Sequence, residues 1–182
     1  MEQTEPTANT GTETGAGAGA EAGPAKVAVL TVSDGVWEGR REDLSGRLAV
    51  QVLAERLGTG RIISRVVPDR QVMIEQVLRQ WAAEGYDLVV TSGGTGISPT
   101  DVTPQATLAV IDYQVPGLAE LMRIQSFSKT PMAALSRAVA GVLGRTLIVN
   151  LPGSPRGVQE CLDALMPVLP HAIEQLRTGG GH

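Results

Sequence analysis

The chain has 182 residues, and its 19 acidic and 15 basic side chains give a formal net charge of -4. Four of the acids, Glu2, Glu5, Glu13 and Glu21, lie in the first 24 residues, which contain no basic side chain, so the rest of the chain is neutral. This balance excludes the basic face of a nucleic-acid-binding protein, and no apolar run approaches the roughly 20 residues of a membrane span. We therefore expect neither nucleic acid nor a membrane as a partner.

The first 24 residues also differ from the rest in composition, since they contain no Val, Ile, Leu or aromatic side chain. Such a segment buries too little apolar surface to offset the entropy lost on ordering, so residues 1–24 are predicted to be a disordered tail. Residues 25–178 are predicted to form one domain, followed by a flexible C-terminus at 179–182. The N-terminus lacks the basic and apolar regions of a signal peptide, which favours a cytoplasmic protein.

The first two predicted elements are a strand and a helix. Residues 26–32, KVAVLTV, form a nearly continuous apolar run that is typical of a strand buried on both faces. A helix is predicted from residue 44 to a stop at Gly58, because apolar side chains recur at helical spacing, at Leu44, Leu48, Val52, Leu53 and Leu57.

The same unit then repeats. The alternation of residues 61–67 predicts a strand, and residues 70–85 predict a helix. The apolar face of this helix is formed by Ile74, Val77, Leu78 and Trp81. Residues 86–92, YDLVVTS, predict the third strand, and Thr103 is predicted as the N-cap of the next helix, with Pro104 in its first turn.

The last third of the chain predicts a helix, a hairpin and a closing helix. A looser helical stretch covers residues 116–129, and residues 136–151 predict two short strands around a central glycine. The closing helix is predicted to begin with Ser154 as its N-cap and Pro155 in its first turn. We expect this helix to kink or split at Pro167 and Pro170.

This order of elements predicts an α/β fold, a three-layer sandwich with a mostly parallel central sheet, helices on both faces and a small antiparallel hairpin. In such a sheet, ligands bind beyond the carboxyl ends of the parallel strands. A small, polar or glycine-rich loop follows each of these strands, and the loops begin at Ser33-Asp34, Pro68-Asp69, Ser92-Gly93 and Asn150-Leu151. We expect the loops to meet at one edge of the sheet and to form the site.

Two of these loops are suited to an anion. The loop after the third strand contains Ser92, Gly93, Gly94, Thr95 and Gly96, and the loop after the last strand contains Pro152, Gly153 and Ser154. Glycines let backbone N–H groups approach a phosphate, although adjacent glycines also serve simply to allow a tight turn, and Ser-Pro is an ordinary helix start. Two such turns on one edge favour the ligand. The chain has no G-x-x-x-x-G-K-[ST] motif, which excludes a Walker-type nucleotide site.

Two carboxylates, Asp69 and Asp101, are expected at the same edge of the sheet. Aspartates in such places commonly cap helices. A carboxylate pair at the mouth of a phosphate site also supplies the oxygen ligands that Mg²⁺ prefers, and such an ion bridges the protein to substrate phosphates. The pattern therefore suits the transfer of a nucleotidyl group.

The sulfur and imidazole side chains predict no further chemistry. Cys161 is the single cysteine and falls at a core-like helical position, so we expect a buried apolar residue rather than a nucleophile. His171 and His182 are too few and too far apart for a zinc site.

Six segments occur in an order that identifies a family. They are TVSD (31–34), EDLSG (42–46), VPD (67–69), TSGGTGISPTDVTPQAT (91–107), LSRAVAGVLGRTLIVNLPGSP (135–155) and QECLDALMPVLPHAI (159–173). In these segments the chain resembles the molybdopterin-binding Mog/MoaB family of molybdenum cofactor biosynthesis. The resemblance covers about residues 26–176.

The resemblance implies a molybdopterin adenylyltransferase, which uses Mg-ATP to form adenylylated molybdopterin and pyrophosphate. In the relatives the aspartates that match Asp69 and Asp101 are functional carboxylates, so the resemblance implies that this pair holds Mg²⁺ and supports catalysis. The two glycine turns, together with Ser33 and Asp34, are then expected to bind the substrates. The resemblance also implies a homotrimer, with the molybdate-inserting enzyme of the pathway as a further partner.

One position departs from the pattern, because Thr100 stands where many relatives carry arginine. Arg137 and Arg156 are candidates to replace the missing charge, and a turn residue of little consequence is the alternative interpretation. If the charge is required, the chain is instead a MoaB-like protein that binds molybdopterin without adenylyl transfer. A trimeric scaffold in the manner of gephyrin and a flavodoxin-like flavin binder are further alternatives. The single folded domain argues against the scaffold, and the aromatic content of 3% argues against the flavin binder.

Overall fold

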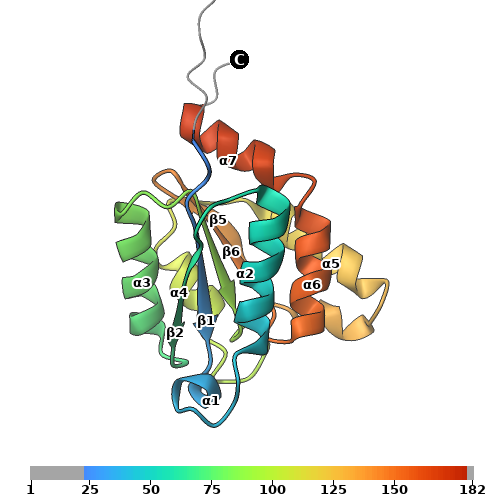
Figure 1. The fold of residues 1–182 in the computed structure, drawn as a ribbon. Helices are drawn as coiled ribbons and strands as arrows, with labels where there is room; N and C mark the ends of the chain where they lie inside the picture. The colour runs from blue at the N-terminus through green and yellow to red at the C-terminus, as the bar shows by residue number, and fades with distance from the viewer. Residues whose placement is uncertain (1–22, 180–182) are drawn as a thin grey trace, which may run out of the picture.

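The computed structural model describes residues 23–179, which form a six-stranded sheet in the order β2-β1-β3-β6-β5-β4 (Figure 1). The strands are β1 (Val27–Val32), β2 (Ile63–Val67), β3 (Leu88–Ser92), β4 (Tyr113–Gln114), β5 (Ala140–Leu143) and β6 (Thr146–Leu151). β1, β2, β3 and β6 are parallel, whereas β5 runs antiparallel to both β6 and β4. The predicted mostly parallel sheet with a small antiparallel hairpin is confirmed.

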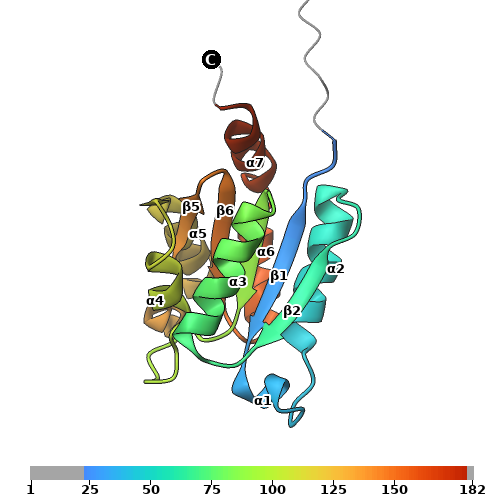
Figure 2. The same cartoon turned by 90° about the vertical axis from the view of Figure 1, so that its left-hand side faces the viewer.

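Helices cover both faces of this sheet. They are α1 (Asp34–Trp37), α2 (Leu44–Leu57), α3 (Gln71–Ala83), α4 (Thr103–Leu108), α5 (Pro116–Phe127), α6 (Pro155–Leu165), α7 (Leu169–Thr178) and the 3-10 helix η1 (Pro131–Leu135). Figure 2 shows α3 and α4 in front of the sheet, with α2, α5 and α6 behind it. The predicted three layers are therefore present.

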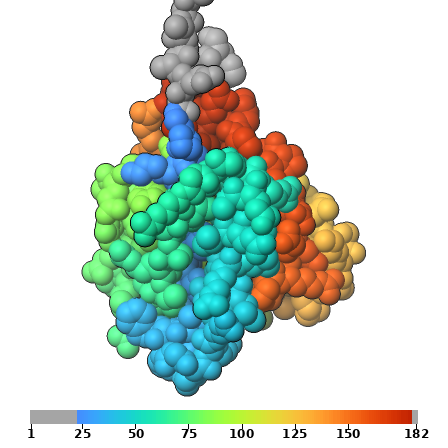
Figure 3. Space-filling model, in the orientation of Figure 1, coloured from blue at the N-terminus to red at the C-terminus, as the bar shows by residue number. Residues whose placement is uncertain are grey.

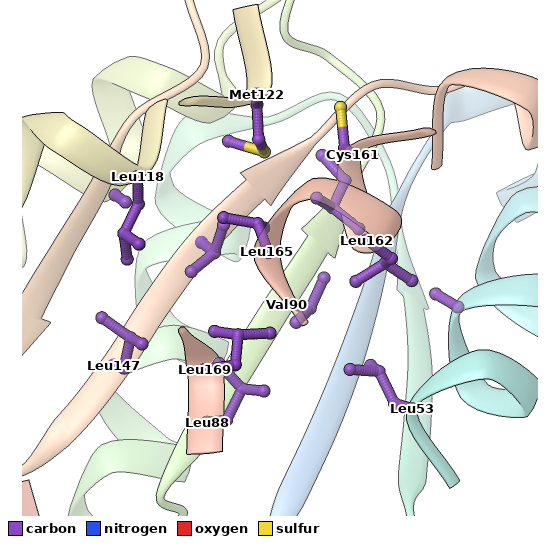
Figure 4. Packing of buried hydrophobic residues seen from close by; sticks show 14 of the residues in the cluster. Leu53, Leu88, Val90, Leu118, Met122, Leu147, Cys161, Leu162, Leu165 and Leu169 are labelled. Atoms are coloured by element: carbon purple, nitrogen blue, oxygen red, sulfur yellow. The ribbon is translucent and has the colours of Figure 1, made fainter. Parts of the chain in front are cut away.

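The strands divide the core into two clusters, because successive side chains of a strand point to opposite faces. Val29 of β1 belongs to the cluster under α2, α5 and α6, and Leu30 belongs to the cluster under α3 and α4. Figure 4 shows part of the first cluster, with Leu53, Leu88, Val90, Leu147, Leu162 and Leu165. Burial on both faces explains why β1, β3 and β6 read as continuous apolar runs.

The start of α4 differs from the prediction. Thr103 is not the N-cap, because Val102 occupies that position and makes no side-chain capping bond. Thr103 lies inside the helix, is buried, and donates its hydroxyl to the carbonyl of Gly93 at 2.8 Å. A long-range bond to the glycine loop thus replaces the local cap. α1, β4 and η1 are also absent from the sequence prediction.

The closing helix follows the prediction. The Ser154 hydroxyl accepts the Gly157 N–H at 3.1 Å, which confirms the N-cap, and Pro155 begins α6. The helix ends at Leu165 and restarts as α7 at Leu169, so the two later prolines split it.

Asn150 was expected to start a loop, but it lies within β6 and is buried. Its side-chain nitrogen Nδ2 donates to the hydroxyls of Thr91 at 3.0 Å and Thr107 at 2.8 Å. Its side-chain oxygen Oδ1 accepts the Val139 N–H at 3.2 Å. One buried side chain therefore ties β6 to β3, α4 and the start of the hairpin.

We expect Asn150→Leu to lower the free energy of unfolding by about 2–4 kcal/mol. Leucine has a similar volume but leaves the polar groups of Thr91, Thr107 and Val139 without their buried partner. Urea denaturation followed by circular dichroism measures the loss. Gln51→Leu, at an exposed position of α2, is the matched control and is expected to change stability by less than about 0.5 kcal/mol. Equal losses in the two variants would contradict the role given to Asn150.

Both ends of the described chain lie at the end of the sheet where β1 begins, opposite α1 (Figures 1 and 2). The predicted tail falls outside the described residues except at its last two positions, and the predicted C-terminus falls outside them except at Gly179. Between residues 23 and 179, no helix combines the length and apolar character that crossing a membrane requires.

Candidate functional site

The register of the parallel strands brings the predicted loops together at one edge of the sheet. Val32 pairs with Val67, and Ser92 pairs with Leu151. The residues that follow these strand ends, Ser33, Pro68, Gly93 and Pro152, therefore lie in a row. α1 comes directly after Ser33 and forms the lower tip of the molecule in Figures 1 and 3.

Gly93 lies at the point where three of these loops touch. Its φ is 104°, and a Cβ at this position would lie 2.3 Å from the carbonyl oxygen of Val32. On the other side, a Cβ on Gly153 would lie 3.3 Å from the Gly93 Cα. Only a glycine meets both the dihedral and the steric demand, so the loops after β1, β3 and β6 approach at backbone distance.

The two glycine turns present backbone donors without partners. The N–H groups of Gly94, Thr95 and Gly96 meet no acceptor in the part of the chain that the structure describes, and the same holds for Gly153 and Ser154. Gly93, predicted to bind substrate in the same way, instead donates its N–H to the Leu151 carbonyl at 3.2 Å. Neighbouring N–H groups of this kind make an anion-binding concavity.

Asp34 and Asp69 hold each other in place across the ends of β1 and β2. The Asp34 N–H donates to Asp69 Oδ2 at 2.7 Å, and the Asp69 N–H donates to Asp34 Oδ1 at 3.0 Å. The second oxygen of Asp69 faces the glycine loop, since a Cβ on Gly94 would lie 3.3 Å from Oδ1. The carboxylate therefore lies beside the unpartnered amides.

The environment of Asp69 disfavours its charged form. Burial raises the pKa of this carboxyl, and the negative charges of Asp34 and Asp101 raise it further, whereas the Asp34 N–H and the Arg41 guanidinium oppose the rise. Two other carboxylates are therefore close enough to Asp69 to repel its negative charge. A bound cation would relieve this repulsion.

Asp69→Asn is expected to raise the free energy of unfolding at about pH 7, in the absence of divalent cations. The folded-state pKa lies above the ordinary value of 3.8. Ionised Asp69 therefore destabilises the folded state, and this destabilisation is complete at pH values above the folded-state pKa. It vanishes below the ordinary value, where both states are protonated. The gain should therefore shrink near about pH 3.5, and urea denaturation at the two pH values measures it. A loss of stability at neutral pH would contradict the prediction.

Arg137 fixes the loop that carries Asp101. Its Nε donates to the Gly96 carbonyl at 2.6 Å, its guanidinium also donates to the Asp101 carbonyl, and its backbone N–H donates to the Thr95 carbonyl at 2.9 Å. The Asp101 side chain closes the turn by accepting the Ser98 N–H at 2.8 Å. Arg137 thus positions both the free amides and the second predicted carboxylate.

The other predicted side chains hold the loops in shape. Ser33 caps α1 by accepting the Val36 N–H at 3.3 Å, and Ser92 donates to the Pro152 carbonyl at 3.1 Å. Both arginines considered as a replacement for a charge at Thr100 already have partners. Arg137 binds the two loop carbonyls, and Arg156 donates to Glu160 at 2.9 Å.

A pocket of about 520 Å³ opens beside the glycine turns, between α5, η1 and α6. Its lining includes Thr95, Gly96, Met122, Ser126, Ser136 and Gly153. Met122 and Cys161 belong both to the pocket wall and to the core, and Figure 4 shows them at the upper end of the core cluster. The volume lies in the range of small-molecule sites, and the wall offers both polar and apolar contacts.

The sequence pattern did not predict most of the residues that line this pocket. Met122, Ser126 and Ser136 come from α5 and the segment after η1, which precede the hairpin and follow no parallel strand. Cys161 is buried, as predicted, and burial raises the pKa of its thiol, which disfavours a nucleophilic role.

The carboxylates fit a metal ion only together with a ligand. Among the described residues, no group of three or more His, Cys, Asp or Glu side chains is arranged to hold a metal ion. Mg²⁺ is usually held by one or two carboxylates together with substrate phosphates. The repulsion at Asp69 and the neighbouring anion-binding amides match that arrangement, so Asp69 and Asp101 fit Mg²⁺ as a pair.

Most of the chain is similar in sequence to a protein family and to characterised proteins. The sequence model of the family described as "Probable molybdopterin binding domain" matches residues 28–171. The "Molybdopterin adenylyltransferase" of Helicobacter pylori is 41% identical over 150 residues, which cover 81% of this chain and 85% of that protein. The "Molybdenum cofactor synthesis protein cinnamon" of Drosophila melanogaster is 40% identical over 146 residues, which cover 80% of this chain but 24% of that protein.

Solved structures agree with these relatives. The molybdopterin biosynthesis enzyme MoaB of Thermus thermophilus superposes with a TM-score of 0.80 at 52% identity, over 85% of this chain and 97% of that chain. The molybdopterin biosynthesis Mog protein of Mycobacterium ulcerans gives a TM-score of 0.79 at 42% identity, over 84% and 99% of the two chains. The chain therefore belongs to the molybdopterin-binding Mog/MoaB family.

Proposed function

We propose that the protein is a molybdopterin adenylyltransferase that uses Mg-ATP. The observation that carries the proposal is the row of unpartnered amides, Gly94 to Gly96 with Gly153 and Ser154, between the carboxylates of Asp69 and Asp101 and the pocket. The names of relatives about 40% identical over most of the chain support the same activity.

In the proposed reaction an oxygen of the molybdopterin phosphate attacks the α-phosphorus of ATP. A new P–O bond forms, the bond from the α-phosphorus to the α,β-bridging oxygen breaks, and that oxygen leaves with pyrophosphate. Such a transfer asks mainly for positioning and for stabilisation of charge. When bound, Mg²⁺ neutralises phosphate charge and stabilises the pyrophosphate leaving group.

Different residues are proposed to hold the metal ion, the phosphates and the pterin. Asp69 and Asp101 hold the metal ion, and Asp34 fixes Asp69 through the paired backbone bonds. The free amides of the two turns bind phosphate oxygens. The pocket beside the turns is the proposed place of the pterin, since its wall offers the apolar side chain of Met122 and the polar atoms of Ser126 and Ser136.

Single-turnover incubation of the purified protein with molybdopterin and labelled Mg-ATP tests the proposal, with adenylylated pterin as the readout. We expect product from the wild-type chain. Tight pterin binding without product would overturn the proposal in favour of a molybdopterin-binding protein without adenylyl transfer.

Thr100 is the observation that favours this second function, because it leaves the Asp101 turn without a cationic side chain of its own. Its hydroxyl instead lies 3.1 Å from the Ser98 hydroxyl. Thr100→Arg separates the two functions. Under the proposed function, the wild type forms adenylylated pterin and the substitution changes the rate of its formation. If the chain only binds molybdopterin, the wild type forms no adenylylated pterin and only the variant does.

The proposal extends to the setting of the enzyme. A cytoplasmic homotrimer would pass adenylylated molybdopterin to the molybdate-inserting enzyme of the pathway. Sedimentation equilibrium of the full chain gives the number of copies, and a monomer would remove the trimer from the proposal.

A further inference from the structure

Arg41 folds back over the one-turn helix α1. Its backbone N–H donates to the Gly35 carbonyl at 2.9 Å. Its side chain covers the same residue, since a Cβ built on Gly35 would lie 2.6 Å from Arg41 Nε. Gly35 is buried even though α1 lies at the tip of the molecule (Figure 3). The guanidinium is thus held against the helix that begins with Asp34.

The donors of this guanidinium are uncommitted. In residues 23–179, Arg41 takes part in no ion pair and donates no side-chain hydrogen bond. The adjacent Arg40, by contrast, is paired with Glu38. Arg41 nevertheless lies next to the site, because Gly35, which its side chain covers, directly follows Asp34, whose N–H donates to Asp69. It is therefore a positioned cation beside the carboxylates whose hydrogen-bonding capacity is available to a ligand.

We propose that Arg41 binds the β- and γ-phosphates of the nucleotide next to Asp34 and Asp69. The inference rests on the proposed function and adds a residue that the sequence pattern did not single out. One Mg²⁺ held by two carboxylates leaves most of the negative charge of a triphosphate unbalanced, so a cation of the protein beside them would help to hold its outer end. A guanidinium suits this task because it presents several donors in a plane.

The position of Arg41 also bears on Thr100. The glycine loop lacks an arginine at Thr100, and the guanidiniums of Arg137 and Arg156 already have partners. Arg41 comes from a different segment, the loop between α1 and α2, and lies against Gly35. The negative charge of the leaving pyrophosphate is then stabilised by Arg41, in the loop after α1, rather than by a side chain of the Asp101 turn.

Calorimetric titration of the full chain with an ATP analogue that carries a methylene group between its α- and β-phosphates tests the proposal, in the presence of Mg²⁺. We expect Arg41→Gln to weaken binding of the analogue about 10- to 100-fold, since a hydrogen bond to a charged group contributes on this scale. Binding of AMP, which lacks the outer phosphates, should change less than about threefold. Gly35→Ala should weaken the analogue in the same direction, because the new Cβ displaces the guanidinium.

Arg40→Gln is the matched control, because Arg40 is adjacent, exposed and paired with Glu38, and its affinity should equal that of the wild type. Circular dichroism verifies that each variant is folded. If the wild type binds the analogue and Arg41→Gln binds it equally well, the inference about Arg41 is overturned while the proposed function stands. If the wild type binds no analogue, the proposed function and the inference fall together.

Discussion

Asp101→Asn is expected to lower the single-turnover rate of adenylyl transfer at least about 100-fold. The substitution removes one negative charge where the proposed metal ion binds. In the wild type the Ser98 N–H donates to the Asp101 carboxylate at 2.8 Å, and asparagine keeps a side-chain oxygen that accepts the same N–H. The turn fixed by Arg137 should therefore persist, and the loss should report charge rather than shape. Quenched-flow measurement of labelled adenylylated pterin gives the rate.

Asp163→Asn is the control for this result. Asp163 is an exposed carboxylate of α6 that pairs with Arg56, away from the loops at the strand ends. Its variant should transfer at the wild-type rate. An Asp101→Asn rate within about tenfold of the wild type would remove Asp101 from the metal site, because a direct ligand is worth more than that.

Gly93→Ala is expected to lower the free energy of unfolding by about 3 kcal/mol or more. The new Cβ meets the Val32 carbonyl oxygen at 2.3 Å, and the φ of 104° is strained for any residue with a Cβ. The clash is with backbone of β1, so a rotamer change does not relieve it. Urea denaturation measures the loss, and pterin binding by the surviving folded fraction should also weaken.

Gly39→Ala separates the two causes. Gly39 also has positive φ, at 71°, but a Cβ there meets nothing within 4 Å. Its variant should lose only about 1 kcal/mol, the usual conformational cost of such a position. If the two alanine variants lost the same amount, contact with β1 would not explain the requirement for glycine at position 93.

The sheet was predictable because its inner strands are buried on both faces. Val27 to Val32 and Leu88 to Ser92 are buried throughout, and such runs are visible in any sequence. β4 was not predictable, because it has two exposed residues, Tyr113 and Gln114, and exists only through its pairing with β5. η1, with the sequence PMAAL, has no buried residue, so no alternation of buried and exposed positions marks it in the sequence.

The candidate site likewise contains residues that a sequence pattern predicts and residues that only tertiary contacts reveal. Asp34, Asp69 and Gly93 follow strand ends, and parallel register placed them together as the sequence predicted. Arg137 acts through backbone carbonyls on a distant segment, and Arg41 acts by folding its side chain over Gly35; no periodic pattern in the sequence indicates either contact. The error at Thr103 has the same origin, because a local capping rule was applied to a side chain that bonds to Gly93.

The placement of residues 23 and 179, the two ends of the described part of the chain, has a consequence for protein architecture. Both lie at the end of the sheet away from α1 and the glycine turns (Figures 1 and 2). A second domain joined before β1 or after α7 is therefore attached at the end of the sheet opposite the glycine turns. The domain can be built into longer polypeptides at either end, in keeping with the Drosophila relative, in which the matching region covers 24% of the protein. An affinity tag or reporter fused at either end should leave substrate access unchanged.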